Sequence, residues 1–169
     1  MTQSVKKTSQ SEADALRPLS SLPEALSFRI SRLAAINERS GGRYFKREYD
    51  LTLVEWRILG LTATEGMIHF TTLRDTLLLD KGQLSRTIKA LVARGLIETR
   101  NSEADARQID LHITPAGQEL NDQALRFTSQ RNAVLAGVLT QAERAEFERM
   151  LDLLIGHNQA LLAKGITNG

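Results

Sequence analysis

The hydrophobic periodicity of the chain changes at Gly95, and this change restricts the possible folds more than any other feature. Before Gly95, apolar side chains recur three or four residues apart, as they do on one face of a helix. After it, residues 96–100 and 108–113 favour extended strands, and the second segment alternates polar and apolar throughout. The sequence therefore predicts a helix that ends at Gly95, where positive φ is tolerated, and then a two-stranded hairpin with a polar turn at 101–107.

Capping signals predict two helices directly before this hairpin. Asp80 and Gln83 have the spacing of a capping box and begin a helix that runs to Arg94. A shorter helix is predicted over residues 71–78. Residues 71–113 thus have the order helix, turn, helix, strand, loop, strand, which is typical of a helix-turn-helix followed by a wing.

An amphipathic helix is predicted near the start of the chain. Ser21 and Glu24 have capping-box spacing, and apolar residues follow at helical intervals as far as Ile36. Gly41 and Gly42 are expected to break this helix or to lie near its end.

Three more helices are predicted around the winged segment. Thr52 and Glu55 begin one before it, with the spacing of a second capping box. Pro115 begins a long helix directly after it, at the first helical position, where proline is well tolerated. Thr140 and Glu143 have capping-box spacing again and begin the last helix.

The composition narrows the function classes. The chain has no cysteine, which excludes disulfides, thiolate metal sites and thiol-based redox sensing. Its aromatic content of 5% argues against a single-stranded nucleic-acid binder, which stacks bases on aromatic rings. The net charge of +2 means that a duplex binder has to concentrate its positive charge locally. Without a signal peptide or a membrane-spanning apolar run, a cytoplasmic location is expected, with no membrane contact and no cofactor.

The helix from Asp80 to Arg94 carries the chemistry that a DNA major groove requires. Its buried face is predicted to be Leu84, Ile88 and Leu91, which places Arg86 almost opposite. Arginine bonds guanine and glutamine pairs with adenine, whereas lysine is better suited to phosphates. An ordinary solvated helix face is the alternative. The expected DNA contacts on this helix are Lys81, Gly82, Gln83, Ser85, Arg86 and Lys89.

The start of the preceding helix adds a second expected contact. Free amides and hydroxyls at Thr71 and Thr72 can hold a phosphate, although the two threonines are equally suited to act as plain helix caps.

The residues of this region resemble the MarR (multiple antibiotic resistance regulator) family. Its helix-turn-helix and first wing strand are similar to LRDTLLLDKGQLSRTIKALVARGLIETR. Its wing tip, second strand and following helix are similar to EADARQIDLHITPAGQEL, including the D-x-R signature at Asp105 and Arg107. The resemblance covers roughly residues 25–160. One departure is the turn of the helix-turn-helix, where family members often carry glycine and this chain has three leucines, at 77–79.

The resemblance implies roles for the wing and for the flanking helices. Arg107 would enter the minor groove, whose narrow form attracts arginine, while Asp105 braces the loop; a purely structural Asp–Arg pair is the competing interpretation. The ends of the chain would form a homodimer that binds a pseudo-palindromic duplex site. The predicted fold is mainly α with a small β-wing: a winged helix-turn-helix with N- and C-terminal dimerisation helices. Its parts are a disordered arm at 1–20, dimerisation helices at 21–50 and 114–165, and the winged helix-turn-helix at 51–113.

The resemblance also implies a repressor that a small, often aromatic or phenolic, ligand releases from DNA. The candidate contacts are Tyr44, Phe45, Trp56, Arg57, Met67, His69 and Phe70, all of which also suit a core or a loop. Two alternatives stay open: a metal-responsive regulator of the same fold, and a winged helix that binds protein. An enzyme is not expected, because the three histidines are isolated, without a nucleophile motif or metal-ligand spacing.

Overall fold

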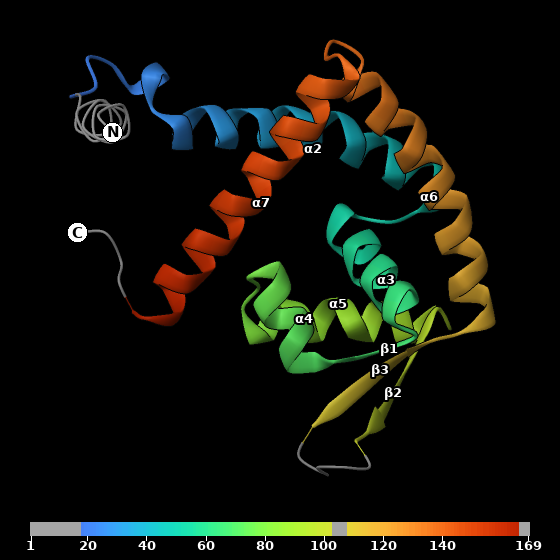
Figure 1. Cartoon of the computed structure of the whole chain (residues 1–169). Coiled ribbons are helices and arrows are strands. Elements are labelled where there is room, and N and C mark those ends of the chain that lie inside the picture. The colour runs from blue at the N-terminus through green and yellow to red at the C-terminus, as the bar shows by residue number, and fades with distance from the viewer. Residues whose placement is uncertain (1–17, 103–107, 166–169) are drawn as a thin grey trace, which may run out of the picture. The chain divides into compact units, whose positions relative to one another are not determined.

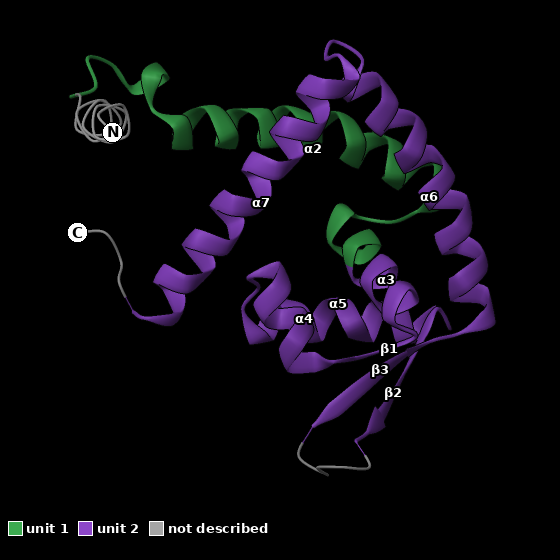
Figure 2. Cartoon of the chain, in the orientation of Figure 1, with its two compact units in different colours: residues 1–57 green, residues 58–169 purple. Residues whose placement is uncertain are grey.

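The computed structural model describes residues 18–102 and 108–165 (Figure 1). The chain divides into two compact units, residues 1–57 and 58–169 (Figure 2). As predicted, the fold is mainly helical with a small sheet. The elements in chain order are η1 (Leu22–Glu24), α2 (Leu26–Tyr49), α3 (Leu53–Glu65), β1 (Met67–His69), α4 (Phe70–Leu77), α5 (Lys81–Ala93), β2 (Ile97–Asn101), β3 (Ile109–Ile113), α6 (Pro115–Ala136) and α7 (Gln141–Ala163).

The first helix differs from its prediction at both ends. Ser21 does not cap it: the Ser21 hydroxyl donates to the Glu24 carboxylate, and the 3₁₀ turn of η1 precedes α2. The expected break at Gly41 and Gly42 is also wrong, because α2 continues to Tyr49. Gly41 is buried, and a Cβ on Gly42 would lie 3.6 Å from the Leu53 side chain. These glycines therefore lie in a packed stretch of helix instead of forming a turn.

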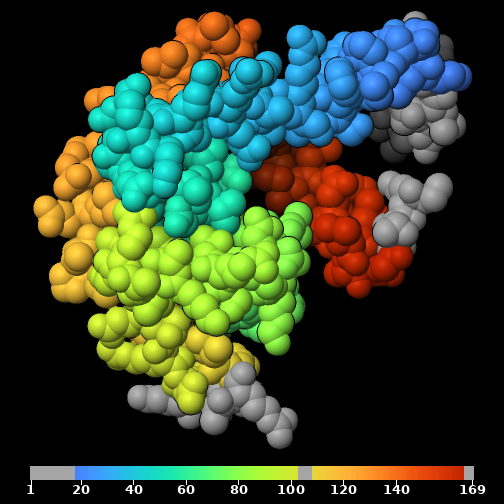
Figure 3. All heavy atoms as spheres, turned by 180° about the vertical axis from the view of Figure 1, so that it is seen from behind, coloured from blue at the N-terminus to red at the C-terminus, as the bar shows by residue number. Residues whose placement is uncertain are grey.

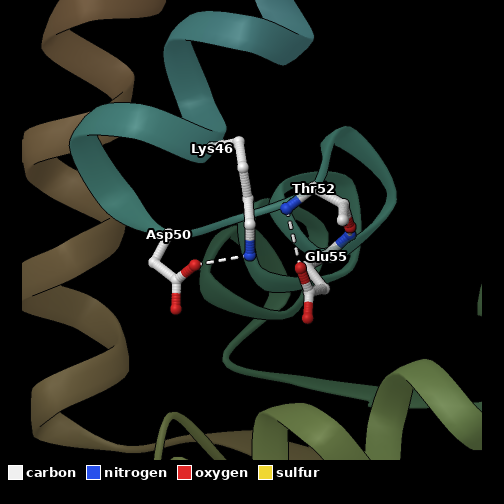
Figure 4. A network of polar contacts seen from close by, with 4 residues as sticks. All are labelled: Lys46, Asp50, Thr52 and Glu55. Carbon is white, nitrogen blue, oxygen red and sulfur yellow. Dashed lines mark hydrogen bonds and ion pairs between the residues drawn. The ribbon is translucent and has the colours of Figure 1, made fainter.

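The connection from α2 to α3 is fixed by a short polar network (Figure 4). Asp50 takes a left-handed conformation, with φ of 50°, and its side chain pairs with Lys46. The Thr52 amide donates to Glu55 Oε2 at 2.7 Å, and the Glu55 amide donates to Thr52 Oγ1 at 3.2 Å. Both halves of the predicted capping box are thus present, and they set the start of α3.

The second unit contains the wing sheet, whose strand order is β1-β3-β2 with antiparallel pairs. The two predicted strands are confirmed as β2 and β3. The sequence did not predict β1, which pairs with β3 from Met67 opposite His112 to His69 opposite Asp110. A strand of three residues is too short to show an alternating pattern, so only its tertiary pairing reveals it.

The core of the second unit lies between α3, α4, α5 and the sheet. The predicted buried face of α5 is confirmed, because the exposed fractions of Leu84, Ile88 and Leu91 are 0%, 6% and 0%. The other elements contribute further buried side chains to this core: Ile58, Leu59 and Thr62 from α3, Ile68 from β1, Leu73 from α4, and Leu96, Ile97 and Leu111 around the wing strands. Helix α5 is therefore held by one apolar face, and its other side is left for the surface.

A close backbone contact joins the end of α5 to the start of α6. Gly95 has φ of 67°, and its amide donates to Val92 O at 2.8 Å, while the Leu96 amide donates to Leu91 O at 3.0 Å. These bonds form a Schellman motif, which ends α5 at the predicted glycine. Gly117 of α6 lies so near that a Cβ there would stand 1.9 Å from the Leu96 carbonyl oxygen.

We predict that Gly117→Ala destabilises the fold by about 3 kcal/mol, because the added methyl cannot be placed without moving backbone. The measurement is urea denaturation of the variant and the parent at one protein concentration, with the free energy of unfolding taken at equal slope.

Gly42→Ala is the matched control, since its Cβ would make only ordinary contact with Leu53. Alanine is the better helix former, so this variant should gain up to about 1 kcal/mol if α2 runs through position 42. Equal stabilities for the two variants would contradict the close approach at Gly117.

Candidate nucleic-acid interface

Helices α4 and α5 form the helix-turn-helix of the second unit. The turn between them is made without glycine: Leu78 takes φ of 53°, a left-handed conformation that costs a residue with a Cβ roughly 1–2 kcal/mol. Asp80 then caps α5 by accepting a bond from the Gln83 amide at 2.8 Å, as predicted. Leu78 thus takes a conformation that glycine would adopt without this cost.

The outward side of α5 is an open surface, visible as yellow-green atoms in the space-filling view (Figure 3). Lys81, Arg86 and Lys89 are exposed there, and Gln83 and Ser85 are half-buried. No acidic residue occurs within α5, so these three cations make the surface positively charged. This arrangement supplies the local concentration of positive charge that the small net charge of the chain does not.

Gly82 has a steric role beside Arg86. A Cβ at position 82 would lie 3.3 Å from Arg86 Nη1 and 3.2 Å from Asp80 Oδ1. The glycine therefore leaves room for the guanidinium to lie over the first turn of α5, next to the cap.

The start of α4 exposes Thr71 and Thr72 in its first turn. The residue at the cap position is His69, so the alternative that the two threonines are plain caps is wrong. The His69 side chain does not cap the helix either, because its Nδ1 lies 2.6 Å from Asp110 Oδ1 on β3. The first-turn amides of α4 thus have no side-chain cap and remain suited to an anion.

The two expected wing contacts, Asp105 and Arg107, lie outside the described residues. The strands that lead to them are described: the Ser102 amide donates to Gln108 O at 3.0 Å and closes the base of the loop.

Two residues that the sequence did not single out join this surface. Arg74 of α4 and Gln108 beside β3 line one pocket together with Lys81 and Ser85 of α5. Neither lies on the recognition helix, so helical periodicity could not have found them.

The comparisons with known proteins agree with this geometry. The model of the MarR family matches residues 49–108. The HTH-type transcriptional regulator MgrA of Staphylococcus aureus is 25% identical over 120 residues, which are 71% of this chain and 80% of MgrA. Residues 49–108 are thus similar to the MarR family, in agreement with the resemblance of the sequence.

Solved structures of the MarR family share the fold. A MarR-family regulator from Listeria monocytogenes, complexed with 26mer DNA, has a TM-score of 0.75 at 24% identity, over 86% of this chain and 98% of its own. A MarR mutant from E. coli, complexed with operator DNA, has a TM-score of 0.68 at 24% identity, over 79% and 94%. These likenesses show that the chain has the winged-helix fold of these regulators.

The expected ligand contacts fall into two groups. Four belong to the first unit: Phe45 is 3% exposed and stacks on Trp56, with ring centroids 5.3 Å apart, while Tyr44 is half-buried. Arg57 is exposed and pairs with Glu38 at 2.7 Å. This packing gives Phe45 a core role, and it leaves Tyr44, Trp56 and Arg57 partly accessible.

The other three expected ligand contacts belong to the second unit. Met67 is 39% exposed on β1, His69 is bonded to Asp110, and Phe70 lines the pocket beside Arg74.

Neither a metal site nor a membrane span is found in the described part of the chain. Residues 18–102 and 108–165 contain no group of three or more potential protein ligands that could hold a metal ion. In the same ranges, no helix has the length and apolar character needed to cross a bilayer.

We predict that Asp80→Ala lowers the free energy of unfolding by about 1 kcal/mol, because it leaves the first-turn amides of α5 without their acceptor. Asp80→Asn is the control, since its amide oxygen can accept the same bond from Gln83. Both are measured by urea denaturation. A loss of similar size in the two variants would show that the Asp80 charge, and not the cap, stabilises the helix.

Proposed function

We propose that this protein is a transcriptional regulator that binds duplex DNA sequence-specifically, with α5 in the major groove. The observation that carries the proposal is the division of α5 into a buried apolar face and an outward face with three cations and no acid. A helix of this kind, followed by a wing, is the arrangement that winged helix-turn-helix proteins place against DNA. The two structural relatives complexed with DNA support the same use of the fold.

The side chains on α5 have separate roles in this proposal. Arg86 and Gln83 contact base edges, because their paired donors and acceptors fit guanine and adenine. Lys81 and Lys89 bind phosphates, with Gly82 and Ser85 allowing close approach of the backbone. Thr71 and Thr72 offer a further phosphate contact at the start of α4. On the wing, Asp105 and Arg107 keep the roles that the family resemblance implies.

A homodimer is proposed because both flanking regions expose apolar surface. On α2 the exposed fractions of Leu26, Ile30 and Leu33 are 58%, 42% and 43%, at the spacing of one helix face. On α7 the exposed apolar residues include Phe147, Met150, Leu153, Ile155 and Leu162. Since monomeric proteins seldom expose apolar patches of this extent, we assign 21–50 and 114–165 to dimerisation. Two recognition helices would then meet half-sites about 34 Å apart.

Repression relieved by a small aromatic or phenolic ligand is the finer part of the proposal. The half-buried rings of Tyr44 and Trp56 offer ring contact to such an anion, and the exposed Arg57, paired with Glu38, offers a positive charge in the same unit. A ligand shifts DNA affinity only if it prefers one conformation of the dimer. A thermal-shift screen of aromatic acids and phenols tests for such a ligand.

A cytoplasmic location is part of the same proposal, because a protein that binds DNA acts in the compartment that holds its operators.

We predict that Arg86→Ala and Lys89→Ala impair DNA binding in different ways. Arg86→Ala should cost about 1–3 kcal/mol and relax the base preference at one position of each half-site. Lys89→Ala should weaken binding about equally across sequences and reduce the salt slope by about 1 for each lost phosphate contact. Footprinting upstream of the chain's own and neighbouring genes finds the site, and titrations on site variants measure both effects.

Absence of any protected site at low salt would refute DNA binding as a whole. Unchanged affinity and preference in Arg86→Ala would refute only the assignment of the helix face.

We predict that Ile30→Glu shifts the protein toward monomer, because it places an uncompensated charge in the proposed apolar interface. Ser31→Glu adds the same charge one position along the exposed surface of α2 and should leave the dimer intact. Sedimentation velocity at several concentrations distinguishes the species. Dimers of equal affinity in both variants would show that this face of α2 is not the interface.

A further inference from the structure

A pocket lies where α4, α5 and the wing sheet meet, beside the recognition face. It has a volume of about 240 Å³ and is lined by Phe70, Thr71, Arg74, Lys81, Ser85, Gln108 and Ile109. Three separate parts of the winged region thus contribute to one small cavity. We propose that this pocket holds one phosphodiester of the DNA backbone, with Arg74 and Lys81 as its two cations. The proposal rests on the DNA binding proposed above.

The charge of the lining fits a phosphate. Arg74 and Lys81 are positive, Thr71 and Ser85 offer hydroxyl donors, and Gln108 offers an amide. Among the described residues of the lining there is no carboxylate. Lysine and arginine neutralise phosphates by charge, and hydroxyl or amide donors orient the oxygens.

The position of Lys81 is unfavourable for the helix that carries it. It is the first residue of α5, where the helix dipole disfavours a cation, and no acidic side chain follows in the first turn. A residue type that opposes the stability of its own helix is typical of a functional position. An anion in the pocket would reverse this penalty, since it would lie near both the Lys81 ammonium and the start of α5.

The apolar part of the lining favours a phosphodiester over a free phosphate ion. Phe70 is half-buried and Ile109 is 43% exposed, so both present carbon surface to the pocket. Deoxyribose carbons flank every phosphate of a DNA strand and can cover such surface, whereas inorganic phosphate has no apolar part. On α5 the pocket is lined by Lys81 and Ser85, which lie one turn apart, and not by Arg86. The pocket would therefore hold the DNA backbone while Arg86 contacts the bases.

Arg74 can bind the phosphate because its present partner, Asp75, holds it only weakly. Its guanidinium pairs with the adjacent Asp75, with Nη2 2.8 Å from the carboxylate, and both side chains are well exposed. An exposed pair of this kind contributes little to stability, so a phosphate can replace or share the carboxylate. Asp75 is therefore a negative charge next to the proposed phosphate, and removal of that charge should strengthen DNA binding.

The test combines neutral side chains with neutral phosphates. A duplex operator is synthesised with a single methylphosphonate at each backbone position in turn, placed symmetrically in both half-sites. Each duplex is titrated with the parent protein, Lys81→Gln, Arg74→Gln and Lys89→Gln. The parent should lose roughly tenfold in affinity at each phosphate that it contacts. Lys81→Gln and Arg74→Gln should both lose their sensitivity at one and the same phosphate, while Lys89→Gln should lose it at a different one.

Three further measurements have stated outcomes. Lys81→Gln should bind DNA more weakly and yet unfold at the same or a higher temperature than the parent, which an unfolding defect would not produce. Asp75→Asn should bind DNA about two- to threefold more tightly at low salt. Lys164→Gln removes one cation outside the winged region and should leave the methylphosphonate pattern unchanged.

Several results would overturn the proposal. If Arg74→Gln and Lys81→Gln lose sensitivity at different phosphates, or at none, the pocket does not hold one phosphodiester. If inorganic phosphate inhibits DNA binding more than chloride at equal ionic strength, and Lys81→Gln abolishes that selectivity, the pocket binds the free ion. Failure of the parent protein to bind any operator would instead refute the proposed function.

Discussion

The winged region depends on one hydroxyl, that of Thr114. Its Oγ1 donates to the Gly95 carbonyl oxygen at 2.7 Å and accepts the Gly117 amide at 3.0 Å, while the Thr114 amide donates to Leu96 O at 3.2 Å. These bonds tie together the end of α5, the first residues before β2 and the start of α6. Gly117 makes the contact possible, because any side chain there would collide with the Leu96 carbonyl. Helix α5, the wing strands and helix α6 are therefore positioned by a single junction.

This junction explains how α5 can keep a face free of packing. Its end is fixed by the Schellman bonds at Gly95 and its start by the Asp80 cap, and Leu84, Ile88 and Leu91 anchor the side between them. Because both ends and one face of α5 are held, the residues on its outward face are not needed for packing. Their charge and hydrogen-bonding groups are therefore free to serve binding. Lys81 shows the extreme case, since it occupies a position where the helix dipole works against it.

The features that the sequence predicted are those that depend on neighbours a few residues away. Capping boxes at Thr52 and Thr140 and the cap at Asp80 are confirmed, because a side chain and an amide three residues apart suffice to make them. The outward face of α5 follows from helical geometry in the same way. Two of the failures depend on tertiary contacts: packing carries α2 through Gly41 and Gly42, and only the pairing with β3 defines β1. Arg74 and Gln108 belong to the same class, since the fold alone brings them beside Lys81. The failure at Ser21 is local, because its hydroxyl bonds the Glu24 carboxylate and caps no amide.

The rigidity of the junction also limits how an effector can act. A ligand that prefers one arrangement of the dimer over another has to change the spacing of the two recognition helices to alter DNA affinity. A loose link between α5 and α6 would absorb such a change. Here Thr114 bonds both ends of the link, and the contact at Gly117 leaves no room for them to slide. In a dimer formed through the flanking helices, a displacement of α6 would consequently move α5 with it. The same hydroxyl that joins α5 to α6 would thus transmit such a displacement to the surface proposed to bind DNA.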